Sequence, residues 1–251
     1  MKRFSYFLGI ALMLGIINST FFGCGLGSPA KIDSAQVAIT KTVNSLATLH
    51  PVIIEVITSE NLKYTGQELG DAKWLAEIGA HVTRWRNHTA IFAMVNDAVE
   101  FADNIKKNWH GVYDSVKVYD KPFYKFDRSH CVDTVTSKQW TNIFLTANLV
   151  ADLKLQQEYL DHHKTQFEKW PEVSQGFCNA SFQQLLVFKT GRQLMLVISI
   201  PKGESLDKLN PLTTKNNPRV DDWNKLMSKY QEGIPGTKKG ETWVFLKPVG
   251  R

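Results

Sequence analysis

The chain has 251 residues, of which 43% are hydrophobic and 22% are charged, and its formal net charge is +6. This length is enough for two small domains or one double domain, and no low-complexity tract interrupts it. The basic excess is mild and is not gathered into a cluster, so nucleic acid is not an indicated partner.

Residues 1–24 resemble a signal peptide. Two basic residues precede an apolar run over 7–17, which is too short and too close to the terminus for a membrane span. The segment ends in Gly23-Cys24, which resembles the lipobox of bacterial lipoproteins, in which the cysteine becomes lipidated. The alternative is an ordinary cleaved signal peptide. We therefore predict an exported chain, a periplasmic or cell-surface lipoprotein that meets the membrane only through a lipid on Cys24.

Residues 25–48 are small and polar, and they are expected to serve as a tether between the leader and the folded part. Removing the leader takes Lys2 and Arg3 away and lowers the formal charge from +6 to +4. Of the three cysteines, Cys131 and Cys178 then remain. They can pair in an oxidising compartment, although nothing in their spacing requires it.

Residues 49–130 contain a first run of predicted elements. Their order is a strand over 51–58, a helix over 70–78, a hairpin of strands over 82–85 and 90–95, a helix over 97–109, and a closing strand within 112–126. The first strand is rich in β-branched residues, and the second helix places Phe101 and Ile105 on one apolar face. Pro122 has no N–H for a sheet ladder, so it either cuts the closing strand or places it on an edge.

Residues 141–251 contain a second run in the same order. It consists of a strand over 142–150, a helix over 155–173, a hairpin of strands over 185–188 and 194–200, a helix over 221–230, and a strand over 243–249. Each run is β-α-β-β-α-β, the ferredoxin-like order of an α+β fold. We predict two tandem ferredoxin-like units that pair as an α+β barrel, either within one chain or in a homodimer.

The helix over 155–173 carries an aromatic stripe with an imidazole inside it. Tyr159, His163, Phe167 and Trp170 stand at i, i+4, i+8 and i+11, which keeps them on one face at about 100° per residue. Histidine exchanges protons near neutral pH, and tyrosine and tryptophan offer apolar faces with a polar handle, as a sugar ring requires. The alternative is a helix that packs its aromatic rings on a sheet and carries a hydrogen-bonded histidine.

The second run resembles the L-rhamnose mutarotase family over about residues 141–249. The pieces that carry the resemblance are Tyr159 with His163, Trp170-Pro171-Glu172-Val173, Gly191-Arg192-Gln193-Leu194-Met195, Asn217-Pro218-Arg219-Val220, Trp223 to Met227, Tyr230-Gln231, Pro235-Gly236 and Gly240 to Val244. One piece alone would be weak, but the ordered set is fairly specific. Residues 49–130 carry no such signature, and their role is unknown.

The resemblance implies a ferredoxin-like, dimeric, cofactor-independent isomerase that interconverts the α and β anomers of L-rhamnose or a related 6-deoxy sugar. By the same resemblance, His163 is the general acid-base, and Tyr159, Trp223 and Trp170 bind the sugar. General acid-base catalysis by one positioned imidazole is worth roughly 10²–10⁴-fold. The competing hypotheses are a non-catalytic, exported sugar-binding or interaction module, and another α+β-barrel reaction on a hydrophobic substrate.

The sequence departs from the family in the spacing of its histidine. The family places its histidine four residues before Trp-Pro-Glu, whereas His163 lies seven residues before Trp170. Aligned from Trp170, the catalytic position is Gln166, which cannot exchange protons. Aligned from Tyr159, three extra residues fall inside the helix. We favour the second register because it keeps Tyr159 and His163 on one face. A further departure is Gln184, where the family often has a sugar-contacting tyrosine.

No metal site is expected. The seven histidines are scattered, and the adjacent pair His162 and His163 points in directions about 100° apart on a helix. The sequence contains no HExxH, CxxC or glycine-rich phosphate loop.

Overall fold

The computed structural model describes residues 48–62, 65–69 and 73–249. The predicted leader, the lipidation site at Cys24 and all but the last residue of the tether lie outside the described residues. Among the residues that are described, no helix combines the length and apolar character needed to cross a bilayer.

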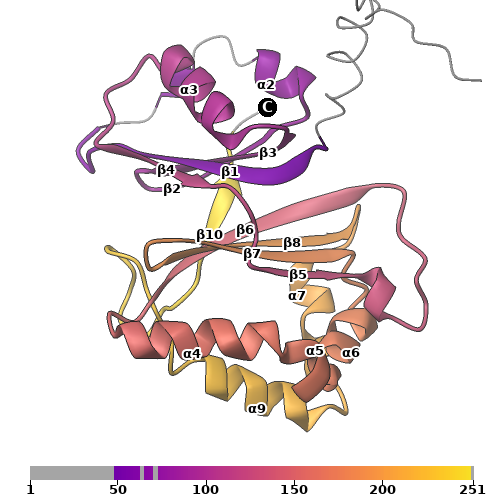
Figure 1. The fold of residues 1–251 in the computed structure, drawn as a ribbon. Helices are drawn as coiled ribbons and strands as arrows, with labels where there is room; N and C mark the ends of the chain where they lie inside the picture. The colour runs from indigo at the N-terminus through magenta and orange to yellow at the C-terminus, as the bar shows by residue number, and fades with distance from the viewer. Residues whose placement is uncertain (1–47, 63–64, 70–72, 250–251) are drawn as a thin grey trace, which may run out of the picture. The chain divides into compact units, whose positions relative to one another are not determined.

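The first run of elements folds into a ferredoxin-like unit. Its elements are β1 (His50–Ile57), η1 (Gln67–Leu69), α2 (Lys73–Glu77), β2 (His81–Trp85), β3 (His88–Val95), α3 (Ala98–Asn108) and β4 (Ser115–Tyr119). The strands pair antiparallel in the order β4-β1-β3-β2, with α2 and α3 on one face (Figure 1). Asp97 begins α3, because its side chain accepts from the backbone N–H groups of Val99 and Glu100.

The second run folds into a second unit of the same topology. Its elements are β6 (Trp140–Leu149), α4 (Leu153–Lys164), α5 (Gln166–Lys169), α6 (Pro171–Asn179), β7 (Gln184–Thr190), β8 (Gln193–Pro201), α7 (Leu206–Leu209), α8 (Pro211–Thr214), α9 (Pro218–Met227), β9 (Gln231–Glu232) and β10 (Val244–Pro248). The four main strands lie in the order β10-β6-β8-β7, and α4, α5, α6 and α9 cover one face (Figure 1). The predicted α+β fold of two ferredoxin-like units is therefore confirmed.

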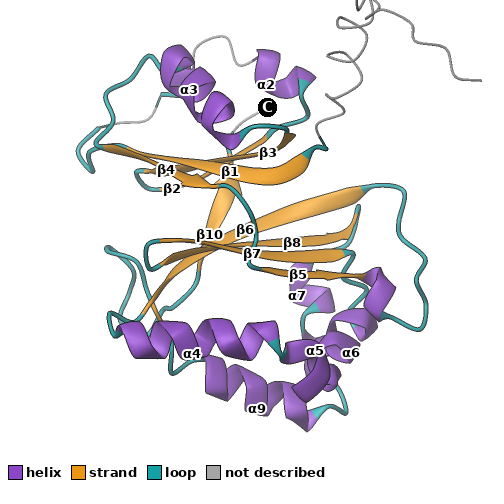
Figure 2. Cartoon of the chain, viewed as in Figure 1, coloured by secondary structure: helices purple, strands orange, loops and turns teal. Residues whose placement is uncertain are grey.

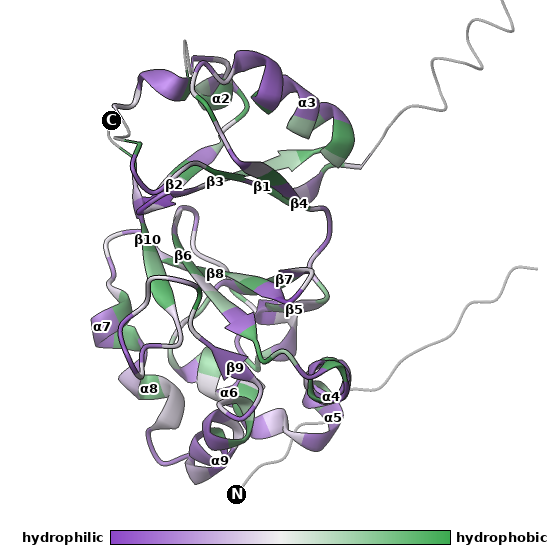
Figure 3. Ribbon diagram, turned by 90° about the vertical axis from the view of Figure 1, so that its left-hand side faces the viewer, coloured by the Kyte–Doolittle hydropathy of each residue, from purple (hydrophilic) through white to green (hydrophobic). Residues whose placement is uncertain are grey.

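The strands of the two units form one continuous hydrogen-bonded sheet, and the units share a hydrophobic core. β10 pairs with β6 through Val244 to Leu246 and with β2 through Lys247 and Pro248. On the other side, the Thr190 hydroxyl of β7 donates to the Val118 carbonyl of β4 at 2.6 Å. Apolar side chains of both sheets form one buried cluster, and most residues of β1 are hydrophobic (Figure 3). The pairing of the units is thus intrachain.

The shared core contains a fully buried carboxylate. Glu55 on β1 accepts from the Tyr119 hydroxyl at 2.9 Å, from Gln193 Nε2 at 2.9 Å and from His88 Nδ1 at 2.7 Å. Gln193 belongs to the second unit and also donates to the Thr146 hydroxyl at 3.0 Å. These hydrogen bonds satisfy the carboxylate and join the two units through polar contacts.

Pro122 cuts the closing strand, and the residues after it join the other unit. β4 ends at Tyr119, and a separate strand β5 (Tyr124–Asp127) pairs antiparallel with β7. A short helix η2 (Arg128–His130) follows, and Cys131 after it forms a disulfide with Cys178 of α6, with a Cα–Cα distance of 5.6 Å. The segment between the units is therefore covalently held against the second unit.

The prediction of one continuous helix over 155–173 is wrong. The first helix, α4, ends at Lys164. Two shorter helices, α5 and α6, follow it and are separated by non-helical residues (Figure 2). Thr165 leaves the helical conformation at ψ 9°, and its hydroxyl donates back to the Asp161 carbonyl. Pro171, which has no N–H, begins α6. Only Tyr159 and His163 share a helix, and the predicted four-residue stripe is not formed.

Candidate functional site

Helix α4 places Tyr159 and His163 side by side against the second sheet. The Asp152 side chain caps the helix by accepting from the N–H groups of Lys154 and Leu155 at 2.8 and 3.0 Å. Tyr159 and His163 are one turn apart, with ring centroids 4.3 Å from each other. Their exposed fractions are 1% and 8%, so the pair is enclosed by protein.

Three aromatic rings from two other parts of the chain lie around the imidazole of His163. The ring centroids lie at 5.1 Å for Tyr124 of β5, 5.2 Å for Trp223 of α9, and 5.6 Å for Phe123, which precedes β5. The predicted residues Tyr159, His163 and Trp223 are therefore brought together. Phe123 and Tyr124 were missed, because the sequence assigned them to the closing strand of the first unit.

The hydrogen bonding of His163 determines which ring nitrogen carries its proton. Nδ1 lies 2.9 Å from the Tyr159 carbonyl oxygen. A carbonyl can only accept, so Nδ1 donates and Nε2 keeps its lone pair in the neutral ring. Burial lowers the pKa of His163 to about 4, although the Tyr159 carbonyl raises it and the neighbouring His162 lowers it further. At neutral pH the imidazole is an uncharged proton acceptor.

The hydroxyl of Tyr159 is a protonated phenol in an apolar surrounding. Burial raises its pKa, and a hydrogen bond from Gln231 acts in the opposite direction. Gln231 Nε2 lies 3.1 Å from the hydroxyl oxygen. The site therefore holds a phenol that can donate a proton beside an imidazole that can accept one, which is the pairing that general acid-base chemistry needs.

Trp170 contacts the Trp223 ring of this cluster. Their ring centroids are 5.6 Å apart, and the Arg219 guanidinium lies 3.9 Å above the Trp170 ring. Trp170 is thus at the rim of the aromatic cluster, and it is not among the rings that contact the imidazole.

Gln166 takes the place of the catalytic histidine when the family is aligned from Trp170. In the structure its side chain makes hydrogen bonds within the core. It is fully buried on α5, where it accepts from the Tyr124 hydroxyl at 2.6 Å and donates to the Trp170 carbonyl at 2.6 Å. These bonds hold β5 to the helix break. The extra residues between His163 and Trp170 therefore fall at a break between helices and do not rotate α4.

His162 is turned toward Tyr230, whose hydroxyl lies 3.1 Å from its Nε2, and so the adjacent histidines do not converge. Across the described part of the chain, no group of three or more His, Cys, Asp or Glu side chains is placed to hold a metal ion. The structure therefore offers no metal centre among these residues.

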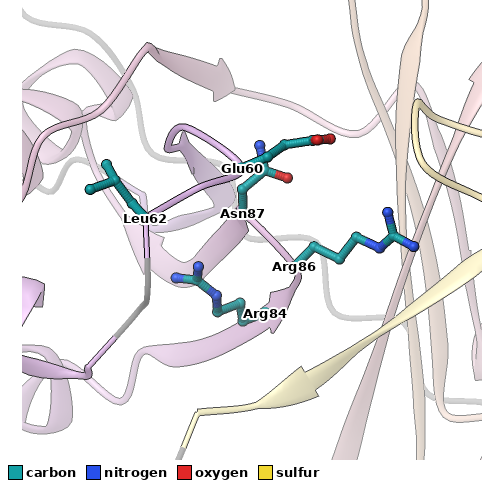
Figure 4. A pocket seen from close by; sticks show the side chains of 5 residues that line it. All are labelled: Glu60, Leu62, Arg84, Arg86 and Asn87. Carbon is teal, nitrogen blue, oxygen red and sulfur yellow. The ribbon is translucent and has the colours of Figure 1, made fainter.

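A cavity of about 340 Å³ lies on the first unit, away from this site. It is lined by Glu60, Leu62, Arg84, Arg86 and Asn87 (Figure 4). The guanidinium groups of Arg84 and Arg86 extend in different directions, and Arg86 has a positive φ of 49° at the β2–β3 turn. Asn87 donates to the Thr58 carbonyl at 2.7 Å, so its amide supports the turn.

Sequence comparison relates this site to sugar mutarotases. A model of the L-rhamnose mutarotase family matches residues 144–249. An L-fucose mutarotase from Xanthomonas campestris pv. campestris is 31% identical over 77 residues, which are 30% of this chain and 60% of that protein. The chain thus spans less than two thirds of that relative. A UPF0734 protein from Dictyostelium discoideum is 30% identical over 104 residues, 38% of this chain and 77% of that protein.

Among solved structures, a proposed monooxygenase from Fusobacterium nucleatum aligns with 82% of this chain and 94% of its own, with 10% identity and a TM-score of 0.45. We draw no functional conclusion from a similarity at this level. The match to the family model, in contrast, covers the helix that bears Tyr159 and His163 and the tail that bears Trp223 and Gln231. The second ferredoxin-like unit of this chain is therefore similar to the L-rhamnose mutarotase family over residues 144–249.

Proposed function

We propose that the protein is an aldose mutarotase that acts on L-rhamnose or a related 6-deoxy sugar. The observation that carries the proposal is the pair formed by His163, an uncharged acceptor, and Tyr159, a protonated donor, on one helix turn. The family match of residues 144–249 supports the reaction class.

In the proposed reaction, Nε2 of His163 takes the proton of the anomeric hydroxyl while the Tyr159 hydroxyl gives its proton to the ring oxygen. The C1–O5 bond breaks, the aldehyde forms, and rotation about C1–C2 exposes the other face of the carbonyl. When O5 attacks again, both protons return and the two side chains regain their starting states. The steps transfer two protons and no net electrons, so the proposed isomerase needs no redox cofactor.

The enclosure by aromatic rings supports recognition of a sugar with an apolar face. Trp223 offers an indole ring 5.2 Å from the imidazole, and the Phe123 ring meets the imidazole edge-on at 5.6 Å. A 6-deoxy sugar has a methyl group and C–H faces that pack on such rings. In the proposed complex, Trp223 contacts the sugar and Trp170 supports Trp223 from behind.

A second candidate is a non-catalytic sugar-binding module, and one observation favours it. General bases work best when their pKa lies near the working pH, whereas burial lowers the pKa of His163 to about 4. An imidazole of this kind accepts a hydrogen bond from a sugar hydroxyl readily but takes its proton reluctantly.

Anomer exchange of L-rhamnose, followed by NMR saturation difference, separates the two candidates. A mutarotase accelerates exchange above buffer, and His163→Gln removes roughly 10²–10⁴-fold of the rate while the sugar still binds. The matched control is His162→Gln, which changes the adjacent histidine and leaves exchange intact. No acceleration of rhamnose, fucose or other aldoses, with binding retained, would establish the binding module instead.

The proposal extends to an exported lipoprotein whose membrane contact is a lipid on Cys24. The disulfide between Cys131 and Cys178 supports an oxidising compartment, because such bonds are rare in reducing cytosol. Incorporation of labelled fatty acid that disappears in Cys24→Ser is the expected result. Labelling that persists in the variant would exclude Cys24 as the lipidation site.

A further inference from the structure

We infer that Gln231 and Trp243 are positioning residues that fix the direction of the hydrogen bond at Tyr159, so that its hydroxyl donates toward the sugar. This inference rests on the proposed mutarotase function. In this inference both residues act through the hydroxyl of Tyr159.

The indole of Trp243 determines the orientation of the Gln231 amide. Trp243 Nε1 lies 3.1 Å from Gln231 Oε1, and an indole N–H can only donate. The amide oxygen must therefore face Trp243, and the amide NH₂ must face the other way. This resolves the usual ambiguity between the two ends of a glutamine amide.

The NH₂ end of that amide lies 3.1 Å from the Tyr159 hydroxyl oxygen. Because Gln231 donates along this line, Tyr159 must accept there, and its own proton is directed elsewhere. The phenol then presents its proton to an acceptor within the site, which in the proposed reaction is the ring oxygen of the sugar. The same donation lowers the pKa of Tyr159, against the larger effect of burial, and so favours loss of that proton.

The backbone holds both positioning residues firmly. Gln231 lies on the short strand β9, which pairs with β6 at Leu149, and the Tyr230 carbonyl accepts from the Val150 N–H at 2.8 Å. The next residue, Glu232, forms an ion pair with Arg192, whose guanidinium also donates to the Leu149 carbonyl. The strand that carries the Gln231 amide is therefore fixed by backbone pairing and by an ion pair.

Trp243 is held in a comparable way. It directly precedes β10, where Val244 pairs with Thr146 of β6. Both partners of the Gln231–Trp243 hydrogen bond are thus anchored on β6, the strand that leads into α4. Trp243, Gln231 and Tyr159 thus form a hydrogen-bonded relay from the sheet to the phenol. This relay keeps the Tyr159 hydroxyl in a fixed position relative to the His163 imidazole.

Two variants test the inference in the full chain. Trp243→Phe replaces the indole by a smaller ring that has no N–H and lets the amide turn its oxygen toward Tyr159, and we expect kcat to fall on the order of tenfold with little change in KM. Gln231→Glu places an acceptor-only carboxylate against Tyr159 at neutral pH. We expect kcat to fall on the order of a hundredfold and to recover as the pH is lowered, because the protonated carboxyl donates again.

The matched control is Gln175→Glu, which makes the same chemical change on α6 and is expected to retain wild-type exchange at every pH. The inference is overturned if Trp243→Phe keeps wild-type kcat. It is equally overturned if the Gln231→Glu loss is independent of pH, since a merely structural role would give that result.

The orientation of the amide is also measurable without activity. In the wild-type protein, NMR cross-peaks are expected between the Gln231 side-chain NH₂ protons and the Tyr159 ring protons. Cross-peaks to the Trp243 indole proton in their place would refute the inference. If the wild type shows no anomer exchange, the proposed function fails, while this measurement still decides whether the relay exists.

Discussion

Replacement of His163 by glutamine should make the protein less sensitive to acid. Burial lowers the pKa of His163 from 6.5 to about 4, so the unfolded chain binds this proton more readily than the folded one. Stability contributed by the neutral imidazole is therefore complete above pH 6.5 and is lost as the pH falls from 6.5 toward 4. With about 1.4 kcal/mol per pKa unit, the loss between pH 8 and pH 4.5 is about 2–3 kcal/mol.

The assay is urea unfolding at a series of pH values, with the free energy of unfolding compared between the wild type and His163→Gln. Asp127, whose pKa is lowered to about 2 chiefly by the Ser129 hydroxyl, also loses stability in acid, but it does so equally in both proteins. The difference between the two curves isolates His163. His162→Gln is the control and should follow the wild type. Parallel curves for the wild type and His163→Gln would refute the burial of a neutral imidazole.

Three further predictions concern the disulfide, the shared core and the aromatic cluster. Replacing Cys131 and Cys178 by alanine removes a cross-link with a sequence separation of 47. Because the unfolded chain then gains loop entropy, the free energy of unfolding should fall by about 4 kcal/mol in denaturant titrations. No fall would show that the bond does not constrain the unfolded chain. Glu55→Ala should cost about 3–5 kcal/mol in the same assay, because three buried donors lose their acceptor, and a cost under about 1 kcal/mol would contradict that network. Trp223→Ala should raise KM for the sugar more than Trp170→Ala, since the Trp223 ring lies against the imidazole and the Trp170 ring lies against Trp223. Equal KM values in steady-state exchange assays would argue against this order.

Much of the fold could be predicted from local patterns. The β-branched run of β1 and the apolar face of α3 are signals carried by neighbouring residues, and both elements form where the sequence places them. Pro122 likewise interrupts a strand for a reason that is local, namely its missing N–H. The pairing of β5 with β7 was not predictable in this way, because it depends on where the segment between the units returns in space.

The helix break shows the limit of periodicity. The spacing of aromatic residues over 155–173 fits one helix, but Thr165 bonds back to Asp161 and Pro171 starts a new helix. Phe167 consequently leaves the predicted stripe and stacks on Tyr124, with ring centroids 5.5 Å apart. Periodicity measures which residues would share a face if the helix continued, and it cannot report that the helix stops.

The sequence by itself determined the order of the elements, the resemblance of about residues 141–249 to a mutarotase family, and the pairing of Tyr159 with His163, because all three are recorded in residue types at short spacings. Only the tertiary structure decided the proton state of His163, since burial and the Tyr159 carbonyl set it. It also decided the direction of the hydrogen bond at Tyr159, which depends on a tryptophan 84 positions along the chain. Chemistry at this site follows from long-range contacts, and such contacts exist only after the two sheets and their helices have packed.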